Sequence, residues 1–182
     1  MLRWEELFAK VRDLQQGQER GLPPEEEEAR RREFEQWVLA IAPRVMTDIR
    51  QEVELRAAEL SKKSGVTVGV VGPNPEGAIN PKAPWLAYLT LNLGSTLLYI
   101  YAARGGGARL SVHMVPDDGA WARKNRRVVS NAGCFVVRTK EGYELRYLRG
   151  DPEGGPKEVM PVGALVYRAF DLLVNAHVKA TP

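Results

Sequence analysis

Apolar residues recur at steps of three and four through the first 64 residues, which is the period of one face of a helix. A first stripe runs from Trp4 to Leu14, and the Pro23-Pro24 pair cannot continue it. The second stripe consists of Phe34, Trp37, Val38, Ile41, Val45, Ile49, Val53, Ala57 and Leu60. We therefore expect amphipathic helices throughout this part of the chain.

The ends of the second helix carry matching signals. Pro24 suits a first helical turn because its missing amide proton would have no partner there, and Glu25–Glu28 place negative charge at the positive end of the helix dipole. Gly65 is a natural residue to follow the last turn. Pro43 lies inside the stripe and lacks the amide proton that a helix interior needs, so it either kinks one helix or starts a second.

After Gly65 the apolar period changes to two, which is typical of strands with one buried face in an antiparallel sheet. The alternating segments are 66–70, 87–93, 110–114 and 143–147. Residues 97–103 are apolar on both faces, so we expect a central strand there. Residues 134–139 and 143–149 flank the short glycine-containing segment KEG, which predicts a hairpin.

The segment VGALVYRAFDLLVNAHV at residues 162–178 is apolar nearly all round, and it predicts a buried helix packed on the sheet. The fold class is therefore α+β, with N-terminal amphipathic helices, a mainly antiparallel sheet of about six strands and this C-terminal helix. The sequence has no β-α-β alternation, which argues against a doubly wound nucleotide-binding fold. We expect residues 1–64 to form a helical arm or subdomain, and residues 65–182 to form the sheet with the C-terminal helix.

Composition is typical of a soluble globular protein. The chain has 182 residues, of which 44% are hydrophobic and 27% charged, and no apolar run approaches the ~20 residues of a membrane span. The first residues include acidic side chains and no unbroken apolar core, unlike a secretory signal. The one cysteine, Cys134, cannot form an internal disulfide, which suits a reducing compartment. We expect a cytoplasmic protein with no membrane association.

The segment RGGGAR at residues 104–109 raises the question of a phosphate-binding loop. Such loops place their glycines between a strand and a helix, so that backbone amides and the helix dipole meet at the anion. Here strand-patterned segments flank the glycines on both sides. The glycines therefore predict the turn of a hairpin, with Arg104 and Arg109 exposed beside it.

The sequence shows no catalytic or metal-ligating pattern. His113, His177 and Cys134 lie at no ligand spacing, and a zinc site needs three or four such ligands. Cys134 and His113 could be strand neighbours, but Cys134 shares a face with Val136 and is typical of an inert core residue. We predict no catalytic residue, no metal site and no cofactor, and the sequence leaves open whether any reaction is catalysed.

A basic segment, WARKNRRVVSNAG at residues 121–133, is patterned neither as helix nor as strand. Its candidate binding residues are Trp121, Arg123, Lys124, Arg126 and Arg127. Arginine binds phosphate or carboxylate with two hydrogen bonds, and an indole stacks on a base. The alternative is a solvated loop anchored by the tryptophan, which we favour because such clusters are common on surfaces. The net charge of +3 is too small to indicate a nucleic-acid binder by itself.

The strand alternation also gathers polar side chains on the face of the sheet opposite its apolar one. The candidate binding residues on this face are Tyr88, Asn92, Arg109, Ser111, His113 and Arg146, with Thr90 and Glu144 beside them. The face is either a polar binding surface or the solvated side that antiparallel sheets ordinarily have, and we favour the solvated side. The proline-rich segment 72–85 is long enough to form a rim over it.

Three functions fit this sequence. The leading hypothesis is a non-enzymatic binding or adaptor module, which forms a homodimer through its N-terminal helices and presents the sheet face and the basic segment to an acidic partner. The second is a small-ligand-binding protein or an enzyme that uses His113 as acid or base and Arg109 or Arg146 to hold an anion. The third is RNA or single-stranded DNA binding through residues 121–127.

Overall fold

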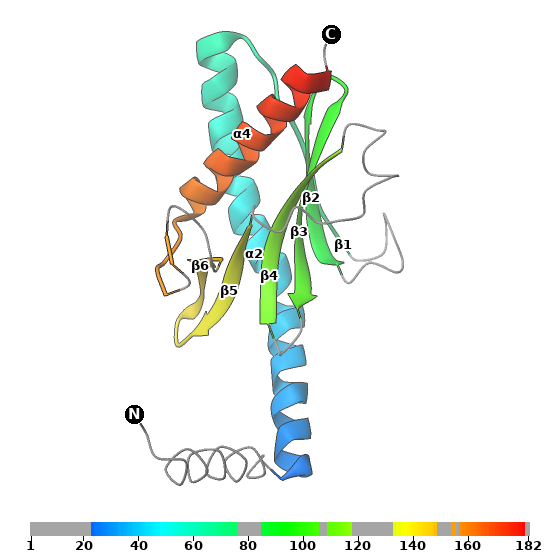
Figure 1. Ribbon diagram of the computed structural model, residues 1–182, viewed down its shortest axis with the longest axis vertical. Helices are drawn as coiled ribbons and strands as arrows, with labels where there is room; N and C mark the ends of the chain where they lie inside the picture. Colours follow the sequence, from blue (N-terminus) through cyan, green and yellow to red (C-terminus); the bar gives the residue numbers. More distant parts are fainter. Residues whose placement is uncertain are drawn as a thin grey trace, which may run out of the picture. The chain divides into compact units, whose positions relative to one another are not determined.

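The structure is a computed structural model that describes residues 23–75, 85–105, 109–117, 133–148, 154–155 and 157–180. Its elements, in chain order, are α2 (Pro24–Ser64), β1 (Gly69–Pro75), β2 (Trp85–Leu93), β3 (Thr96–Gly105), β4 (Arg109–Asp117), β5 (Gly133–Thr139), β6 (Gly142–Tyr147) and α4 (Val162–Ala180) (Figure 1). The predicted α+β class is confirmed. Contacts divide the chain into two units, Met1–Gln36 and Trp37–Pro182, and the second unit holds the sheet, α4 and the larger part of α2.

α2 is one helix that continues across Pro43, which answers the alternative that the sequence left open. A proline ring deprives the carbonyl four residues earlier of its amide partner, and here that residue is Leu39. Leu39 and Pro43 are both exposed, so water can bind this carbonyl. At the end of the helix, Gly65 has a φ of 72° and its amide donates to the Ser61 carbonyl at 2.8 Å. This is the geometry that we expected of the residue after the last turn.

The six strands form one antiparallel sheet in the order β1-β2-β3-β4-β5-β6, so each strand lies beside its neighbours in sequence (Figure 1). β3 lies inside the sheet, as its two apolar faces predicted. Gly105 pairs with Arg109, so RGGGAR joins two antiparallel strands and the predicted hairpin is confirmed. Thr139 pairs with Gly142 at the second predicted hairpin, between β5 and β6.

β1 differs from the prediction at both ends. Alternation predicted a strand over residues 66–70, whereas β1 begins at Gly69 and continues to Pro75, into the segment that we expected to be loop. The difference has a physical reason, because β1 is an edge strand and a proline there need not break a ladder hydrogen bond. Its pairing with β2 is also irregular between Val71 and Asn74.

One face of the sheet carries the apolar core. Cross-strand pairs such as Leu89 with Ile100 and Ile100 with Met114 hold its side chains in rows. The buried residues of this face are Leu89, Leu91, Leu98, Ile100, Leu110, Val112, Met114, Cys134, Val136 and Leu145. Both helices cover this face. Tyr143 of β6 contacts α2 through Asp48, and Tyr147 of β6 lies against Arg168 of α4.

The two edge strands of the sheet both bind the same turn of α2. Tyr143 in β6 donates a hydrogen bond to Asp48 Oδ2 at 2.5 Å, and Arg50 Nη1 donates one to the Gly72 carbonyl in β1. Residues two apart in a helix point about 200° apart, so these side chains leave α2 on opposite sides. A flat sheet of six strands would span roughly 24 Å, twice the diameter of a helix. The sheet must therefore curve around this part of α2.

The apolar stripe of α2 is buried within the chain itself. Its buried residues are Val38, Ile41, Ala42, Val45, Met46, Ile49, Val53 and Ala57. Ile49 lies between Asp48 and Arg50, which bind the two sheet edges, so it faces the concave side of the sheet. The predicted stripe is therefore buried within one chain over residues 38–57.

α4 packs on β2, β3 and β4, as predicted, through the buried side chains of Leu165, Val166, Ala169 and Leu173. The helix is buried along one side only, because Tyr167 is 73% exposed and Val174 and Val178 are exposed as well. A helix on a sheet contacts it along one face only, and the opposite side of α4 remains open. Neither described helix combines the length and the apolar character needed to cross a membrane.

Candidate functional site

The sheet face opposite the helices carries the polar residues that alternation predicted to share it. The register places Tyr88 opposite Tyr101, and Tyr101 opposite His113. Ser111 lies two residues from His113 along β4, on the same face. The prediction that Tyr88, Ser111 and His113 share one face is therefore confirmed, and Tyr101 lies on this face as well. These four residues, Tyr88, Tyr101, Ser111 and His113, are called the polar row below.

The polar row is more buried than we expected when we favoured a solvated face. Tyr88 is 7% exposed, Tyr101 2% and Ser111 5%, so the expectation of a solvated side is wrong for the centre of this face. Tyr88 and Tyr101 belong to a buried cluster with Ala103, and Tyr99 and Val115 pack against this cluster. Alternation indicates the face on which a side chain lies, and it does not indicate whether a tyrosine there is covered.

Within the polar row, Ser111 Oγ lies 2.7 Å from His113 Nε2, a distance suited to a nucleophile and its base. The Ser111 hydroxyl also donates to the Ala103 carbonyl at 3.5 Å. A serine has one proton to donate, so both bonds form together only if the imidazole donates from Nε2, and the serine is then not activated. His113 Nδ1, where a catalytic triad has its orienting group, is buried without a partner among the described residues.

The environment of the polar row suppresses charge. Burial lowers the pKa of His113 and raises the pKa of Tyr101 to about 12, because both side chains lose the solvation of their charged forms. The two rings lie 5.5 Å apart between centroids. A neutral imidazole is a possible general base, but the buried hydroxyl of Ser111 beside it offers no open position for a substrate. His113 is half-buried, and its neighbour Ser111 is buried.

Asn92 and Arg109, two further residues of the predicted face, make contacts within the sheet. Asn92 Oδ1 accepts a hydrogen bond from the Gly69 amide at 3.0 Å, and a side chain at Gly69 would occupy the space that Asn92 fills. The Arg109 guanidinium lies over the ring of Phe135, 5.7 Å from its centroid. Arg109 is exposed, as predicted for a residue beside the hairpin turn.

Arg146 is held at the edge of the sheet. Its guanidinium pairs with Glu144 at 2.9 Å and donates to the Lys157 carbonyl at 3.5 Å. β6 also forms an isolated bridge from Arg146 to Val159. These contacts give Arg146 a structural role, because they tie the segment before α4 to β6.

The basic segment lies outside the described residues, and its five candidates, Trp121, Arg123, Lys124, Arg126 and Arg127, lie there with it. The same holds for residues 76–84, the larger part of the expected rim. The roles proposed for these two segments stay predictions.

Cys134 lies on the apolar face, as predicted, and is fully buried. It pairs with Val112 in the register, whereas His113 pairs with Gly133, so the thiol and the imidazole point to opposite faces. Burial raises the pKa of the thiol to about 12. The structure therefore rules out a Cys134–His113 catalytic pair. In the part of the chain that the structure describes, no group of three or more His, Cys, Asp or Glu residues could hold a metal ion.

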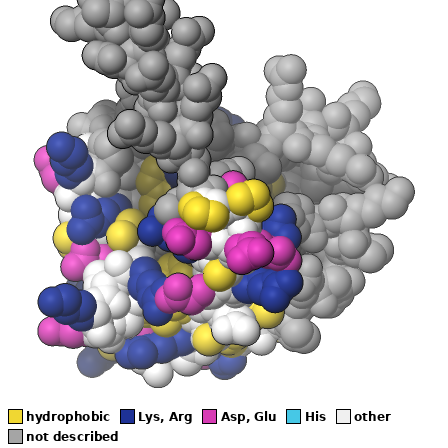
Figure 2. Space-filling model, turned by 90° about the horizontal axis from the view of Figure 1, so that it is seen from below, with side chains coloured by type: hydrophobic (Ala, Val, Ile, Leu, Met, Phe, Trp, Pro, Cys, Tyr) yellow, Lys and Arg dark blue, Asp and Glu magenta, His cyan; other side chains and the backbone are white. Residues whose placement is uncertain are grey.

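Charged side chains of both signs are interspersed on the surface. Figure 2 shows one face of the molecule, on which Lys and Arg side chains lie next to Asp and Glu side chains. Arg32 with Glu28 at 2.5 Å and Arg50 with Glu54 at 2.7 Å are examples of such pairing along α2. Over the described residues of that face, the charges form no extended patch of one sign that would attract an acidic partner or a nucleic acid.

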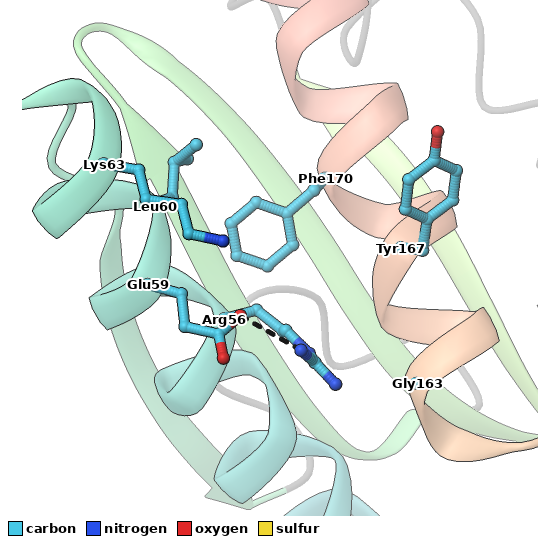
Figure 3. Close-up of a pocket in the computed structure, with 7 residues that line it drawn as sticks. All are labelled: Arg56, Glu59, Leu60, Lys63, Gly163, Tyr167 and Phe170. Atoms are coloured by element: carbon cyan, nitrogen blue, oxygen red, sulfur yellow. Dashed lines mark hydrogen bonds and ion pairs between the residues drawn. The ribbon is translucent and has the colours of Figure 1, made fainter.

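An open pocket lies between α2 and α4, where the sequence predicted no site (Figure 3). Its volume is about 490 Å³. The residues that line it are Arg56, Glu59, Leu60 and Lys63 of α2 and Gly163, Tyr167 and Phe170 of α4. On each helix these positions are three or four residues apart, so they form two facing stripes. This pocket is called the α2–α4 groove below.

The groove combines apolar surface with charge. Leu60, Tyr167 and Phe170 supply the apolar surface, and Figure 3 shows Phe170 directed from α4 toward Leu60. Gly163 adds no side chain to the lining, and a Cβ atom there would be in ordinary contact with Glu52 Oε1 at 3.4 Å. A groove with this lining can hold the apolar part of a ligand while charged side chains contact its polar end.

The groove escaped the sequence analysis because α4 was expected to be a buried helix, and no site was sought on an open side of it. A signal for its open side was present, since Arg168, Asp171 and Asn175 are three and four residues apart and mark a polar stripe on one side of the helix. Tyr167 and Val174 border that stripe and are exposed. The position of α2 beside α4 has no comparable signal, because it depends on how the sheet curves.

No protein-family model matches the sequence, and comparisons with curated proteins and with solved structures found no match. The fold and the groove define an α+β protein with a pocket between two helices that cover one face of its sheet.

Proposed function

We propose that this chain is a non-enzymatic binding module, and that the α2–α4 groove is its binding site for a small amphiphilic molecule. The observation that carries the proposal is Tyr167, a large aromatic side chain that lines the groove and is 73% exposed. A concave site lined by apolar and aromatic side chains with a few polar groups is typical of ligand pockets. The volume of 490 Å³ lies within the range of about 300–1,000 Å³ for such sites.

The polar row gives weaker support to an active site. Catalysis requires a nucleophile and a base that meet the substrate, and Ser111 is buried with its hydroxyl bonded to His113. The groove, by contrast, is open to solvent and lined by side chains that a ligand can reach. An enzyme or ligand site around His113 stays an alternative prediction.

The proposal is tested with Nile red, an uncharged dye whose fluorescence rises in apolar surroundings. Tyr167→Ser and Phe170→Ser each remove apolar surface from the groove, and we expect each to weaken dye binding about fivefold. Fluorescence titration of the full-length variants measures the affinity, and circular dichroism verifies that they fold.

Val178→Ser is the matched control. Val178 is 65% exposed on the same helix but does not line the groove, so its replacement should leave dye binding unchanged. If all three variants lose binding equally, or if none does, the dye is not in the groove and the proposed site is wrong.

The homodimer through the N-terminal helices also stays a prediction, and α2 narrows where its contact could lie. The stripe over residues 38–57 is buried within one chain, so a second chain would have to contact other side chains of the helix. Leu39 and Leu55 are exposed, and 16 residues of separation place them about 160° apart around the helix. Sedimentation of the full chain and of Leu39→Glu tests this dimer, which predicts that only the variant is a monomer.

An acidic protein partner, nucleic-acid binding through residues 121–127 and a cytoplasmic location remain predictions as well. Nucleic-acid binding predicts an affinity that falls steeply with salt and weakens in the double variant Arg126→Ala, Arg127→Ala. A filter-binding assay at two salt concentrations measures both effects. Salt-independent or unaltered binding would contradict that prediction.

A further inference from the structure

We infer that the α2–α4 groove selects a carboxylate-bearing amphiphile, whose carboxylate binds Lys63 and whose alkyl chain lies against Leu60, Tyr167 and Phe170. The inference rests on the proposed function and adds the chemical class of the occupant. It follows from the arrangement of the apolar groups, from the pairing of the charges and from the size of the groove.

The apolar and cationic groups lie in the order that such a molecule needs. Leu60 and Lys63 line the groove within one turn of α2, and Phe170 of α4 faces them. Figure 3 shows the ammonium end of Lys63 directed toward the ring of Phe170, across the groove. A chain that lies along Phe170 and Tyr167 therefore has Lys63 beside one of its ends.

The other charged side chains at the groove form a network in which one arginine contacts two carboxylates. Arg56 Nε lies 2.8 Å from Glu52 and Arg56 Nη1 lies 3.0 Å from Glu59. Hydrogen bonds to Glu52 and then to Glu59 raise the pKa of the Arg56 guanidinium. Glu59, which lines the groove, and Glu52 beside it thus share one guanidinium.

Lys63 is the charged group that a ligand can complement. Within the described part of the chain, it is the lining cation with no ion pair or hydrogen bond. A carboxylate supplies the missing partner, whereas a cationic head group would be repelled by Lys63 and would find Glu52 and Glu59 engaged. The apolar stripe provides affinity, and the lysine provides the preference for an anion.

The size of the preference follows from exposure. Lys63 is exposed, and ion pairs near solvent typically change an affinity by about twofold to fivefold. We therefore expect a preference of that order between a carboxylate and an uncharged head group on the same alkyl chain. Added salt should reduce it, because salt screens exposed charges.

The test uses three ligands with one alkyl chain and different head groups, namely octanoate, 1-octanol and octylammonium. Each is titrated into the full chain labelled with ¹⁵N, and binding is followed through the amide signals of Lys63, Gly163 and Phe170. Octanoate should bind about threefold more tightly than 1-octanol, and octylammonium should bind most weakly.

Two neighbouring lysines provide a matched pair of variants. Lys62 and Lys63 are both exposed in the last turn of α2, but only Lys63 lines the groove. Lys63→Met should abolish the advantage of octanoate over 1-octanol and leave the affinity for 1-octanol within about twofold. Lys62→Met should keep the advantage of octanoate.

The outcomes separate this inference from the proposed function. Equal binding of octanoate and 1-octanol, unchanged in Lys63→Met, would overturn the preference for a carboxylate and leave the groove as an apolar binding site. Tighter binding of octylammonium than of octanoate would also overturn it, since the groove would then select a cation. Groove signals that respond to none of the three ligands would overturn the binding site and the proposed function together.

Discussion

The polar row and the α2–α4 groove lie on opposite faces of one sheet, and they differ in what their side chains contact after folding. In the polar row, Ser111 is bonded to His113 and Tyr101 is 2% exposed. In the groove, Tyr167 is 73% exposed and Lys63 has no partner among the described residues. The row holds the more reactive groups and the groove holds the accessible ones. The comparison teaches that accessibility, more than chemical type, separates a binding surface from a buried polar cluster.

Two tyrosines provide the largest expected contrast. Tyr101→Ala removes a buried ring and should lower the free energy of unfolding by about 3–5 kcal/mol, the range for large buried aromatic side chains. Tyr167→Ala removes an exposed ring and should change it by no more than about 0.5 kcal/mol. Urea unfolding followed by circular dichroism measures both values. Similar losses of unfolding free energy in the two variants would contradict the difference in burial between the polar row and the groove.

Two aliphatic residues of α2 test whether the sheet curves around this helix. This packing holds α2 in the position where it lines the groove. Ile49→Ala removes a side chain that is fully buried and should cost about 2–4 kcal/mol. Leu55→Ala removes one that is 53% exposed and should cost about 0.5 kcal/mol or less. The same urea experiment applies, and a cost at Ile49 as small as that at Leu55 would contradict the curved packing.

The hydrogen bond between Tyr143 and Asp48 holds α2, one wall of the groove, to the edge of the sheet. Tyr143→Phe removes only the donor and should lower the free energy of unfolding by about 1 kcal/mol. Tyr147→Phe is the control, because the Tyr147 hydroxyl has no hydrogen bond among the described residues and its ring contact with Arg168 persists. Thermal or urea unfolding should show no change in the control. Equal effects would mean that the bond does not anchor the helix.

The free energy of unfolding should also depend on pH through His113 of the polar row, and this effect should be smaller than those of the substitutions above. Burial lowers the pKa of His113 in the folded chain below the value of about 6.5 in the unfolded chain. As the pH falls below about 6.5, the unfolded chain binds a proton that the folded chain resists, so the free energy of unfolding decreases. Between pH 7 and pH 5 the wild type should therefore lose more stability than His113→Gln. Parallel curves for the two proteins would show that His113 is not shielded.

Much of the fold could be predicted from the sequence, because its elements follow local periods. Alternation located β2, β4 and both hairpins, and the stripe of α2 with Gly65 at its end located the long helix. The start of β1 could not be predicted in this way. An edge strand accepts proline and an irregular pairing, so its sequence resembles that of a loop.

The candidate sites were predictable to different degrees for physical reasons. Side chains alternate along a strand, so the pattern placed Tyr88, Ser111 and His113 on one face without their coordinates. Their burial depends on what packs over that face, which no period encodes. The groove is made by Leu60 and Phe170, far apart in the sequence, and their approach depends on the curvature of a sheet between them. Local sequence patterns do not indicate whether two such distant side chains approach each other.

The central claim, that this chain binds ligands in the α2–α4 groove and not at the polar row, is tested most directly by mapping where a ligand changes the protein. The measurement is an amide chemical-shift map of the ¹⁵N-labelled wild type as octanoate is added. We predict that the signals of Leu60, Lys63, Gly163 and Phe170 move together with one affinity, and that those of Tyr101, Ser111 and His113 stay in place. Shifts concentrated at Tyr101, Ser111 and His113, with the groove unchanged, would contradict the claim.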